Sequence, residues 1–418
     1  MNRVTKLPRH VLVVGAGIVG VCIALQLRRA GLEVTLIDRD EPGRGCSFGN
    51  AGIIAGDVVA PIAAPGIVTK VPGYLADPEG PLAIRWSYLP ALAPWLVRFV
   101  WAGRQRIFEQ NTRHLASLTA QAQAAFAPLL AEANAADLIR KTGMLTVYET
   151  EQAFADGRRD AAYRRRFGGE AVELGPAEVA ALVPALARVA GGVRRPNPHQ
   201  VVDPLTLTQR LHDLFAKLGG QTLRFAVERI GQVDGQWQAQ GQGTAAQSDA
   251  LVVACGAWSK RLLDTVGLRL PLDTERGYHV MLPGAEGLLS MPVSSGEGGF
   301  FMTPMRHGLR IAGTVEMGGL ERAPDPRRVE VMLRRVRRLL PGIDERNPSS
   351  WMGFRPSMPD SLPVVGPAPG RPGLFLAFGH GHLGLALSAI TGKLLTQLLQ
   401  GEAPSVDLAP FRADRAWT

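Results

Sequence analysis

The 418-residue chain is poor in cysteine and has no long uninterrupted apolar run, and each shortage excludes a class of protein. Its three cysteines, Cys22, Cys46 and Cys255, are too few and too scattered for a disulfide framework or a metal cluster, so a reducing compartment is expected. The longest apolar stretch, residues 82–101, contains two arginines and two prolines, whereas a membrane-spanning helix needs about 20 predominantly apolar residues. The sequence therefore predicts no spanning helix and leaves a surface-lying or core helix open.

Lysine is also scarce, so the net charge of +9 comes mainly from arginine. A basic balance fits an anionic partner, a lipid surface or an acidic cofactor, and it equally fits plain compositional bias. Nucleic acid is not expected, because the chain has no zinc-finger spacing, no basic region with heptads and no aromatic-rich RNA-binding strand. The N-terminal apolar run leads directly into a glycine motif, so we expect no export signal and a cytoplasmic location.

The glycine motif belongs to a strand-helix-strand unit at the start of the chain. β-Branched residues in 10–14 predict a strand, 18–30 a helix, and 33–38 a second strand that ends at Asp38. At this chain length two domains are expected, and the unit opens the first of them.

Each residue of the motif has a physical role in binding a dinucleotide. Gly15 permits a tight turn, Gly17 lets the backbone approach a pyrophosphate, and Gly20 allows close helix packing. The helix N-terminus supplies free N–H groups and a positive dipole end to the phosphates, and Asp38 is placed to accept hydrogen bonds from ribose hydroxyls. These features predict a dinucleotide site but do not separate FAD from NAD.

A loop rich in small residues, 45–52, follows almost at once. Small residues allow close packing against a flat ring system, and Ser47 and Asn50 can hydrogen-bond phosphate or ring edges. The loop therefore favours FAD, although an ordinary flexible loop has a similar composition.

A second glycine pattern, 379–384, follows a predicted strand at 374–378 and precedes a predicted helix at 385–399. Too little chain follows it for another complete βαβ unit, so we interpret it as a helix N-terminus aimed at negative charge on the flavin. His380 and His382 are not expected to bind metal, because no third ligand is nearby.

Between these motifs the pattern predicts loops and helices. Residues 57–80 are rich in proline, glycine and alanine, and 160–169 are densely charged, so both are expected to be loops. Helices are expected at 86–106 and at 112–139, the second breaking near Pro128.

The second half of the chain predicts two further helices and several strands. One helix covers 204–218 behind an Asp203 cap. The other covers 329–340, where an apolar stripe lies opposite four arginines that are either solvated or membrane-facing. Strands are expected at 145–148, 223–230, 236–240, 250–253, 278–282 and 300–314, the last two suggesting an antiparallel sheet.

Five motifs in order, 15–20, 47–52, 252–259, 353–360 and 379–384, resemble the D-amino-acid oxidase superfamily, most closely the bacterial D-amino-acid dehydrogenases and D-hydroxyproline dehydrogenases. The resemblance spans nearly the whole chain. It implies an α/β fold with a Rossmann-type FAD-binding domain and a smaller α+β substrate domain that has a mixed, largely antiparallel sheet. The implied FAD-binding domain comprises residues 1–85, 200–275 and 345–418, and the substrate domain 86–199 and 276–344.

The resemblance also implies site residues. Arg355 would grip the substrate carboxylate, with Tyr278 as second and His279 as third catalytic candidate, and Val227 would contact adenine through its backbone. Arg355 could instead be a buried ion-pair arginine, and Tyr278 a core tyrosine. The predicted cofactor-binding residues are Gly15, Gly17, Ile18, Val19, Gly20, Asp38, Arg39, Ser47, Asn50, Ala51, Gly52, Val227, Cys255, Gly256, Trp258, Gly379, Gly381, His382, Leu383 and Gly384.

The implied activity is transfer of the Cα hydrogen of a D-amino or D-imino acid, such as a D-proline derivative, to flavin N5 as hydride, with electrons passed to a quinone or another carrier. Burial would favour the neutral amine, so no side-chain base is required. The alternatives are an oxygen-using oxidase of glycine, sarcosine or D-amino acids, and a non-catalytic flavin-binding subunit.

Two further expectations concern how the cofactor and the chain are held. No cysteine falls in the C-terminal segment where the sarcosine oxidase branch attaches its flavin, so FAD is expected to be non-covalent. A peripheral contact with the inner face of the cell membrane is compatible with the basic composition.

Overall fold

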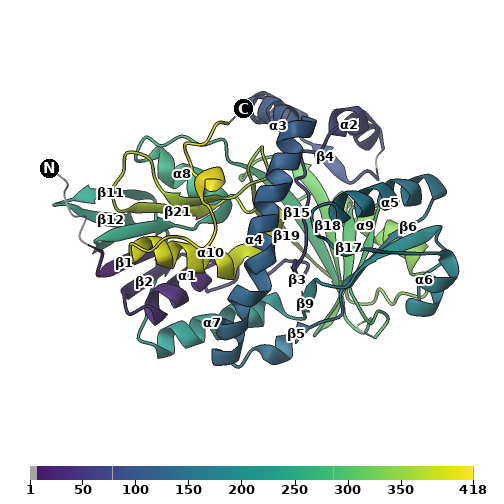
Figure 1. The fold of residues 1–418 in the computed structure, drawn as a ribbon, viewed down its shortest axis with the longest axis horizontal. Coiled ribbons are helices and arrows are strands. Elements are labelled where there is room, and N and C mark those ends of the chain that lie inside the picture. The colour runs from purple at the N-terminus through teal and green to yellow at the C-terminus, as the bar shows by residue number, and fades with distance from the viewer. Residues whose placement is uncertain (1–6, 78, 286, 418) are drawn as a thin grey trace.

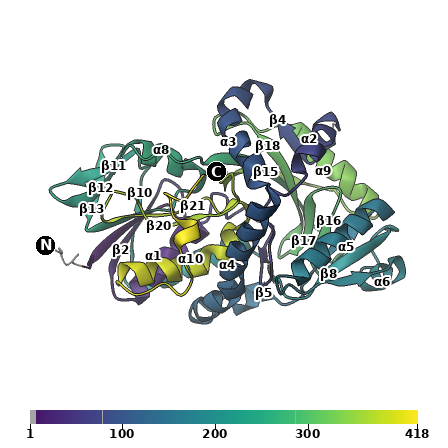
Figure 2. The same cartoon turned by 45° about the horizontal axis from the view of Figure 1, so that its top comes forward.

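The computed structural model describes residues 7–77, 79–285 and 287–417, and it consists of two bodies that lie side by side in Figure 1. One body is built on a six-stranded sheet and the other on a nine-stranded sheet. The long helix α4 (Gln105–Glu132) runs between them, and Figure 2 shows the same arrangement after a turn. This architecture confirms the predicted α/β fold with a second body that has a mixed sheet.

The six-stranded sheet contains the predicted strand-helix-strand unit. Its strand order is β10 (Gln221–Arg224), β2 (Glu33–Asp38), β1 (His10–Val14), β14 (Ala250–Val253), β21 (Leu374–Phe378) and β20 (Val364–Pro367). The first five strands are parallel and β20 is antiparallel. The carboxyl ends of the parallel strands therefore meet at one edge, where open α/β sheets bind their ligands.

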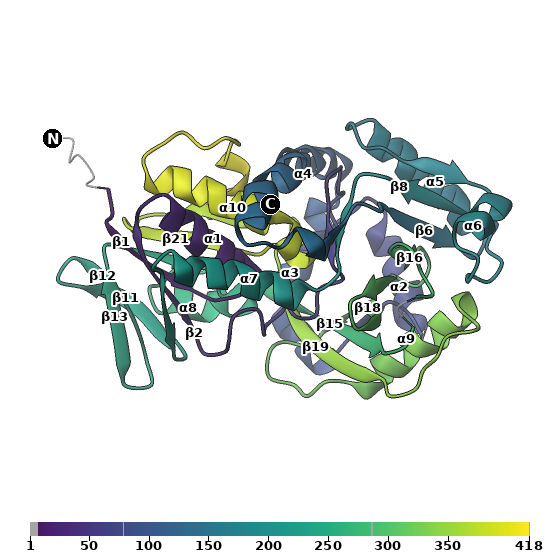
Figure 3. The same ribbon diagram turned by 90° about the horizontal axis from the view of Figure 1, so that it is seen from below.

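Both faces of this sheet are covered, which explains why β1 is almost continuously apolar. Val11 and Val13 pack against helices, whereas Leu12 and Val14 pack toward a three-stranded sheet on the other face. The helices are α1 (Ile18–Arg29), α7 (Pro204–Lys217) and α10 (Gly384–Leu399), with α4 packed on α10. The small sheet consists of β11 (Arg229–Val233), β12 (Gln236–Gly241) and β13 (Thr244–Ser248), and Figure 3 shows these layers from below.

The nine-stranded sheet forms the second body. Its order is β19 (Ser349–Ser357), β15 (Asp273–Leu282), β18 (Gly308–Met317), β17 (Phe300–Met305), β16 (Val293–Ser295), β6 (Met144–Tyr148), β8 (Gly191–Arg195) and β7 (Val172–Leu174), with β4 (Leu82–Ile84) beside β18. The β16–β6 and β18–β4 pairs are parallel and the others antiparallel. Helix α9 (Pro326–Leu339) packs on one face of the sheet through a core that includes Met332 and Val336.

Smaller elements connect or cover the two bodies. A short sheet joins β3 (Ile53–Ile54), β9 (His199–Val201) and β5 (Ile139–Arg140). The remaining helices with more than one turn are α2 (Ile67–Ala76), α3 (Leu89–Ala102), α5 (Glu151–Arg165), α6 (Pro176–Leu182) and α8 (Ser259–Asp264).

Three local predictions were wrong, each because packing outweighs a local signal. Residues 57–80 contain α2 as well as loop, and α4 continues through Pro128, where the buried Phe126 and Leu129 hold the helix against its neighbours. The charged stretch 160–169 begins as the last turns of α5, which buries Phe154 and Ala161 in a small core and leaves most of its charged side chains exposed.

The sheets also place three segments differently from the domain division expected from the sequence. β4 and β19 fall within segments assigned to the FAD-binding domain but pair in the nine-stranded sheet, and α4 was assigned to the substrate domain but packs on α10. We therefore propose boundaries that follow sheet membership. The chain crosses between the bodies repeatedly, so sequence order alone does not give the partner of each strand.

Candidate active site

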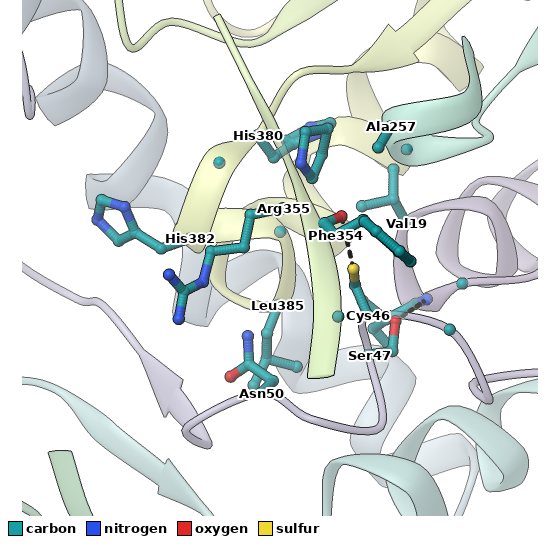
Figure 4. A pocket seen from close by; sticks show the side chains of 18 of the residues that line it. Val19, Cys46, Ser47, Asn50, Ala257, Phe354, Arg355, His380, His382 and Leu385 are labelled. Atoms are coloured by element: carbon teal, nitrogen blue, oxygen red, sulfur yellow. Dashed lines mark hydrogen bonds between the residues drawn. The ribbon is translucent and has the colours of Figure 1, made fainter. Parts of the chain in front are cut away.

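One cavity of about 910 Å³ lies where the two bodies meet, and it is lined from both of them. The six-stranded body contributes the β1–α1 turn, the ends of β2 and β14 and the start of α10, and the nine-stranded body contributes β15, β18 and β19. The cavity thus lies at the carboxyl edge of the parallel strands. Figure 4 shows part of its lining.

The β1–α1 turn has room only for glycine at two of its motif positions. Gly15 has a φ of +112°, and a Cβ there would lie 2.4 Å from the Ala254 carbonyl oxygen. A Cβ on Gly20 would lie 1.7 Å from the Gly15 carbonyl oxygen. Helix α1 follows its N-cap Gly17 without a side-chain cap and without an acidic residue in the first turn, so this end is suited to an anion.

Asp38 and Ser47 fix the geometry of this turn. Asp38 Oδ2 accepts a hydrogen bond from the Ala16 N–H at 2.6 Å, and Ser47 Oγ accepts one from the Ile18 N–H at 2.8 Å. The Asp40 N–H donates to Asp38 Oδ1 at 3.0 Å. Each carboxylate oxygen keeps a further lone pair. Ribose binding by Asp38 stays a prediction that this geometry permits.

The loop 45–52 is held from the second body and is not an ordinary flexible loop. Arg310 Nη1 donates to the carbonyl oxygens of Phe48 at 2.9 Å and Asn50 at 2.7 Å. Asn50 Oδ1 in turn accepts from the Gly52 N–H at 2.8 Å. The buried guanidinium therefore fixes the loop against β18, with its small residues toward the cavity.

His279 supports the same loop and lies outside the lining of the cavity. Its ring stacks on Trp351 with 5.2 Å between centroids, and it lies 5.7 Å from the Phe48 ring. Burial lowers the pKa of His279 to about 3, and the neighbouring Arg310 adds to the effect. The third catalytic candidate is thus placed beneath the loop, in a position suited to packing.

The second glycine pattern turns the chain into α10 at the cavity wall. Gly379 and Gly381 have φ values of +79° and +54°, which favour glycine, and residues 381–385 line the cavity. The start of α10 has no side-chain cap and no acidic residue in its first turn. Its positive end therefore faces the cavity, as expected for a site that stabilises negative charge.

The two histidines of this pattern have different surroundings. His380 is buried, and its Nε2 lies 3.0 Å from Thr391 Oγ1. His382 lines the cavity, where burial, Arg355 and Arg164 lower its pKa to about 4. Within residues 7–77, 79–285 and 287–417, no three side chains of the types that bind metal form a group that could hold an ion.

Arg355 extends from β19 into the cavity, with His382 and Asn50 on either side of it in the view of Figure 4. Its Nη1 donates to the Thr314 carbonyl oxygen at 3.0 Å. The guanidinium lies so close over Gly277 that a Cβ there would be 2.4 Å from Arg355 Cζ. Burial lowers the pKa of Arg355, although an arginine remains charged at neutral pH.

The ion-pair alternative for Arg355 has only a weak candidate among the described residues, the neighbouring Glu275, whose charge raises the pKa of Arg355 but which forms no salt bridge with it. Glu275 stands opposite Arg355 in the β15–β19 register, but its Oε1 accepts a hydrogen bond from Ser357 Oγ at 2.6 Å. No salt bridge to Arg355 is formed by the part of the chain that the structure describes. The other guanidinium nitrogens are therefore left for a ligand.

Tyr278 borders the cavity, but the structure places its hydroxyl on the other face of the sheet. Side chains alternate along β15, so Glu275, Gly277 and His279 share the face of Arg355, and Tyr278 packs into the core beneath α9. The hydroxyl donates to Glu316 and accepts from the Asp325 N–H at 2.9 Å. This favours the core-tyrosine alternative.

Most of the predicted cofactor-binding residues are brought together. Those that line the cavity are Gly15, Gly17, Ile18, Val19, Asp38, Arg39, Ser47, Asn50, Ala51, Val227, Cys255, Gly256, Trp258, Gly381, His382, Leu383 and Gly384. Gly20, Gly52 and Gly379 shape the backbone behind the lining. Sequence reasoning missed Arg164 and Arg195, which also line the cavity and lie in no motif.

Residues 10–398 match the family model DAO, described as FAD dependent oxidoreductase. The chain belongs to this family. It is 38% identical to a protein named D-amino-acid oxidase from Bradyrhizobium diazoefficiens, over 97% of this chain and 99% of that protein. It is 33% identical to D-amino acid dehydrogenase 2 from Ralstonia nicotianae, over 97% of this chain and 100% of that protein. A crystal structure of glycine oxidase from Geobacillus kaustophilus is 25% identical, has a TM-score of 0.77, and the match covers 98% of this chain and 99% of that one.

FAD is the cofactor of this oxidoreductase family, which confirms the prediction made from the motifs. The cavity fits the group. Glycines stand where a Cβ would collide, and the uncapped starts of α1 and α10 both face the cavity. The residues that would hold FAD are those of the β1–α1 turn, the loop 45–52 and the start of α10.

This FAD-dependent oxidoreductase is expected to hold its cofactor without a covalent bond. Cys46 and Cys255 line the cavity, and burial raises the pKa of the Cys46 thiol to about 11 and also raises the pKa of Cys255. Both thiols therefore stay protonated at neutral pH and are poor nucleophiles. Acid precipitation of the purified protein should release the yellow flavin into the supernatant. Flavin that stays in the pellet of the wild type but not of Cys46→Ser would contradict this.

Proposed function

We propose that this oxidoreductase dehydrogenates a D-amino or D-imino acid and passes the electrons to a quinone or another carrier. The observation that carries the proposal is the Arg355 guanidinium, which is held on one side by the Thr314 carbonyl and faces the cavity with its other donors. Relatives named D-amino-acid oxidase and D-amino acid dehydrogenase support the substrate class. A non-catalytic flavin-binding subunit would have no use for such a guanidinium.

Arg355 binds the α-carboxylate of the substrate as a bidentate, charge-assisted pair. Thr314 restrains the direction of the guanidinium, and Gly277 leaves the space in which it lies. The pair orients the Cα–H bond, and burial of the amine favours its neutral form, so that the nitrogen lone pair can form the imine as the Cα–H bond breaks. When bound, FAD supplies the acceptor for the hydride. Water then hydrolyses the imine of a primary amino acid to the keto acid and ammonia, whereas the cyclic imine of a D-imino acid keeps its nitrogen.

The choice between dehydrogenase and oxidase depends on the electron acceptor. We expect the purified protein, reduced by a D-amino acid, to reduce an artificial dye or a quinone much faster than oxygen, because the motifs resemble the dehydrogenases most closely. Anaerobic bleaching of the flavin with D-amino acids, D-proline derivatives, glycine and sarcosine identifies the substrate, and the rate of re-oxidation in air identifies the acceptor. Peroxide formation at the rate of dye reduction would overturn this in favour of an oxidase, and no bleaching with any substrate would favour a non-catalytic subunit.

We infer that the arginine face of α9 is solvated and is not the membrane contact. Arg334 and Arg338 pair with Glu79, which lies near the start of β4, and their side chains are about half exposed. Arg335 and Arg337 also pair with acidic side chains. The solvated alternative for this face is therefore the better one. Within the described residues, no helix combines the length and the apolarity needed to cross a membrane.

Helix α3 offers a better candidate for a peripheral membrane contact. Val97 is 68% exposed, and Val100 and Trp101 are also exposed on the same helix, with the exposed Trp86 just before it. The Arg104 guanidinium lies 3.1 Å from the centroid of the Trp101 ring. Tryptophan and arginine beside exposed apolar residues are typical of surfaces that lie in the lipid interface.

The opposite face of α3 connects this surface to the cavity. Leu92 and Trp95 are buried against Met317 of β18 and pack beside Val315, which lines the cavity. We infer that α3 rests on an anionic lipid surface over the outer side of the cavity wall. That position would bring a lipid-soluble quinone close to the site.

The purified protein should co-sediment with vesicles of phosphatidylcholine and phosphatidylglycerol. Val97→Glu combined with Trp101→Glu should weaken that binding roughly tenfold or more, because each exposed apolar side chain buried in lipid contributes about 1.5–3 kcal/mol. Val233→Glu, on an exposed apolar residue of β11, is the matched control. If the double variant binds vesicles as the wild type does, α3 is not the lipid contact. The same conclusion follows if the double variant loses only self-association, measured in the absence of vesicles, and still binds vesicles.

A further inference from the structure

We infer that the cavity contains a second anion-binding subsite, formed by Arg164 and Arg195, and that the substrate of this enzyme therefore carries a distal carboxylate. This inference rests on the proposed function for the identity of the reacting group. It adds the substrate class, namely dicarboxylic D-amino or D-imino acids such as D-glutamate.

Arg195 ends β8 and lines the cavity with few of its donors used. Its Nη2 donates to the thioether sulfur of Met144 at 2.6 Å, which is a weak acceptor. Its Nη1 lies 3.8 Å from Asp57 Oδ1, too far for a hydrogen bond. Only 16% of the Arg195 side chain is exposed. The guanidinium is therefore largely buried, and its paired N–H donors have no strong acceptor.

Arg164 lines the same cavity from α5, and two hydrogen bonds from its guanidinium hold the side chain in place. Its Nε donates to Asp160 Oδ2 at 2.7 Å, and its Nη1 donates to the Val58 carbonyl oxygen at 2.7 Å. Its Nη2 has no partner among the described residues. A guanidinium held from behind in this way has a free edge with a set direction, which is how arginine binds carboxylates.

The acids beside this pair leave guanidinium donors of both arginines unused, because Asp160 bonds only Arg164 Nε and Asp57 lies 3.8 Å from Arg195. Asp57 is buried and neither of its carboxylate oxygens accepts a hydrogen bond. Burial raises the pKa of Asp57, whereas the neighbouring Arg195 and Arg164 lower it. The Asp160 side chain is half exposed, so water screens the charge that it offers to Arg164. A carboxylate from a ligand would accept the hydrogen bonds that these acids leave unmade.

The two cationic ends belong to one cavity. Arg355 and Arg164 both lower the pKa of His382, so this histidine lies within electrostatic reach of both. The lining of the same cavity also includes apolar side chains from the segment after the loop 45–52 and from the nine-stranded sheet, namely Ile53, Ala55, Val59, Phe301 and Val315. A short methylene chain with a carboxylate at each end suits a cavity that combines separate guanidinium groups with apolar side chains.

The first test uses ligands that cannot be oxidised, so it does not depend on turnover. Glutarate and pentanoate have the same chain length, and each is titrated into the FAD-loaded protein while the flavin absorbance spectrum is followed. We expect glutarate to bind at least roughly 30-fold more tightly than pentanoate, the lower end of what is lost when one partner of a buried charge pair is removed. Equal affinity would overturn the inference.

The second test compares variants. Arg195→Met and Arg164→Met should each remove most of the preference for glutarate, and Arg195→Lys should retain part of it because a charge remains. Arg159→Met is the matched control, because Arg159 lies on α5 with a side chain that is 70% exposed and pairs with Asp156. FAD content and Tm report whether each variant is folded. A preference for glutarate that survives in both folded methionine variants would overturn the assignment of these residues, and the wild-type comparison decides the inference if a variant does not fold.

The third test uses D-glutamate and D-norvaline, which differ at the distal end. Faster anaerobic flavin reduction by D-glutamate than by D-norvaline in the wild type, with a smaller ratio between the two in Arg195→Met, supports the inference. Equal reduction by both in the wild type would overturn it and leave the proposed function intact. If glutarate binds through the two arginines but no D-amino acid reduces the flavin, the subsite stands and the proposed function fails.

Discussion

Arg355→Met is expected to lower kcat/KM for the D-amino acid by roughly 30- to 4,000-fold while FAD is still bound. Removing one partner of a buried charge pair costs about 2–5 kcal/mol, and each 1.4 kcal/mol is a factor of ten. The effect should be specific to the substrate, because Arg355 projects from β19 of the second body and the glycine turn lies in the other. Anaerobic stopped-flow reduction of the flavin at several substrate concentrations measures rate and affinity.

Two further variants sharpen this result. Arg355→Lys should fall between methionine and the wild type, because an ammonium keeps the charge but cannot form the planar bidentate pair. Arg346→Met is the matched control, since Arg346 precedes β19 and its side chain is 86% exposed. If Arg355→Met reduces its flavin at nearly the wild-type rate and affinity, Arg355 does not hold the carboxylate. Neither Arg276 nor Arg306 lines the cavity, so Arg164 or Arg195 would then be the candidate.

Gly277→Ala is expected to lower kcat/KM by about 100-fold with little change in Tm. A Cβ at this position would lie 2.4 Å from Arg355 Cζ, so the guanidinium has to move. The atoms in the way are the far end of a flexible side chain, and Gly277 has no left-handed φ, so the fold can accept the methyl group. A misplacement of about 1 Å in a positioning group can cost about 10² in rate.

A control variant and a double variant distinguish displacement of Arg355 from a general disturbance of the sheet. Gly231→Ala is the control, because nothing lies within 4 Å of a Cβ there and the residue is also in a β-strand. In the double variant Gly277→Ala with Arg355→Met, the two losses should not add, because both act through one guanidinium. Additive losses, or a Gly277→Ala variant with full activity, would show that Gly277 does not act through Arg355.

The dinucleotide turn could be predicted because its requirements are local. Gly20 meets the Gly15 carbonyl oxygen of its own turn, and Asp38 bonds to the Ala16 amide within the same βαβ unit. Helix capping is local too, and Asp203 accepts from the Thr206 N–H at 3.0 Å as expected. Short-range steric and hydrogen-bonding rules suffice for such features.

The face of a strand is a different kind of property. Tyr278 and Gly277 are adjacent on β15, and which one points at the ligand depends on which face of the nine-stranded sheet meets the other body. A register shift between Arg276 and Tyr278 against β18 further changes the local geometry. The resemblance therefore indicated the correct strand, although the side chain predicted from it, Tyr278, packs under α9.

By itself the sequence determined the βαβ unit, because that unit depends on residue types at fixed spacing along one or two elements. The resemblance of its motifs to a known family implied FAD as the cofactor and Arg355 as the arginine for the carboxylate. Only the tertiary structure decided that Arg310 holds the loop 45–52, that His279 packs beneath it, and that Arg164 and Arg195 meet Arg355 in one cavity. Those residues come from α5 and from four strands of the second sheet. Contacts between elements far apart in the chain follow from how the two bodies pack, and no local pattern records that packing.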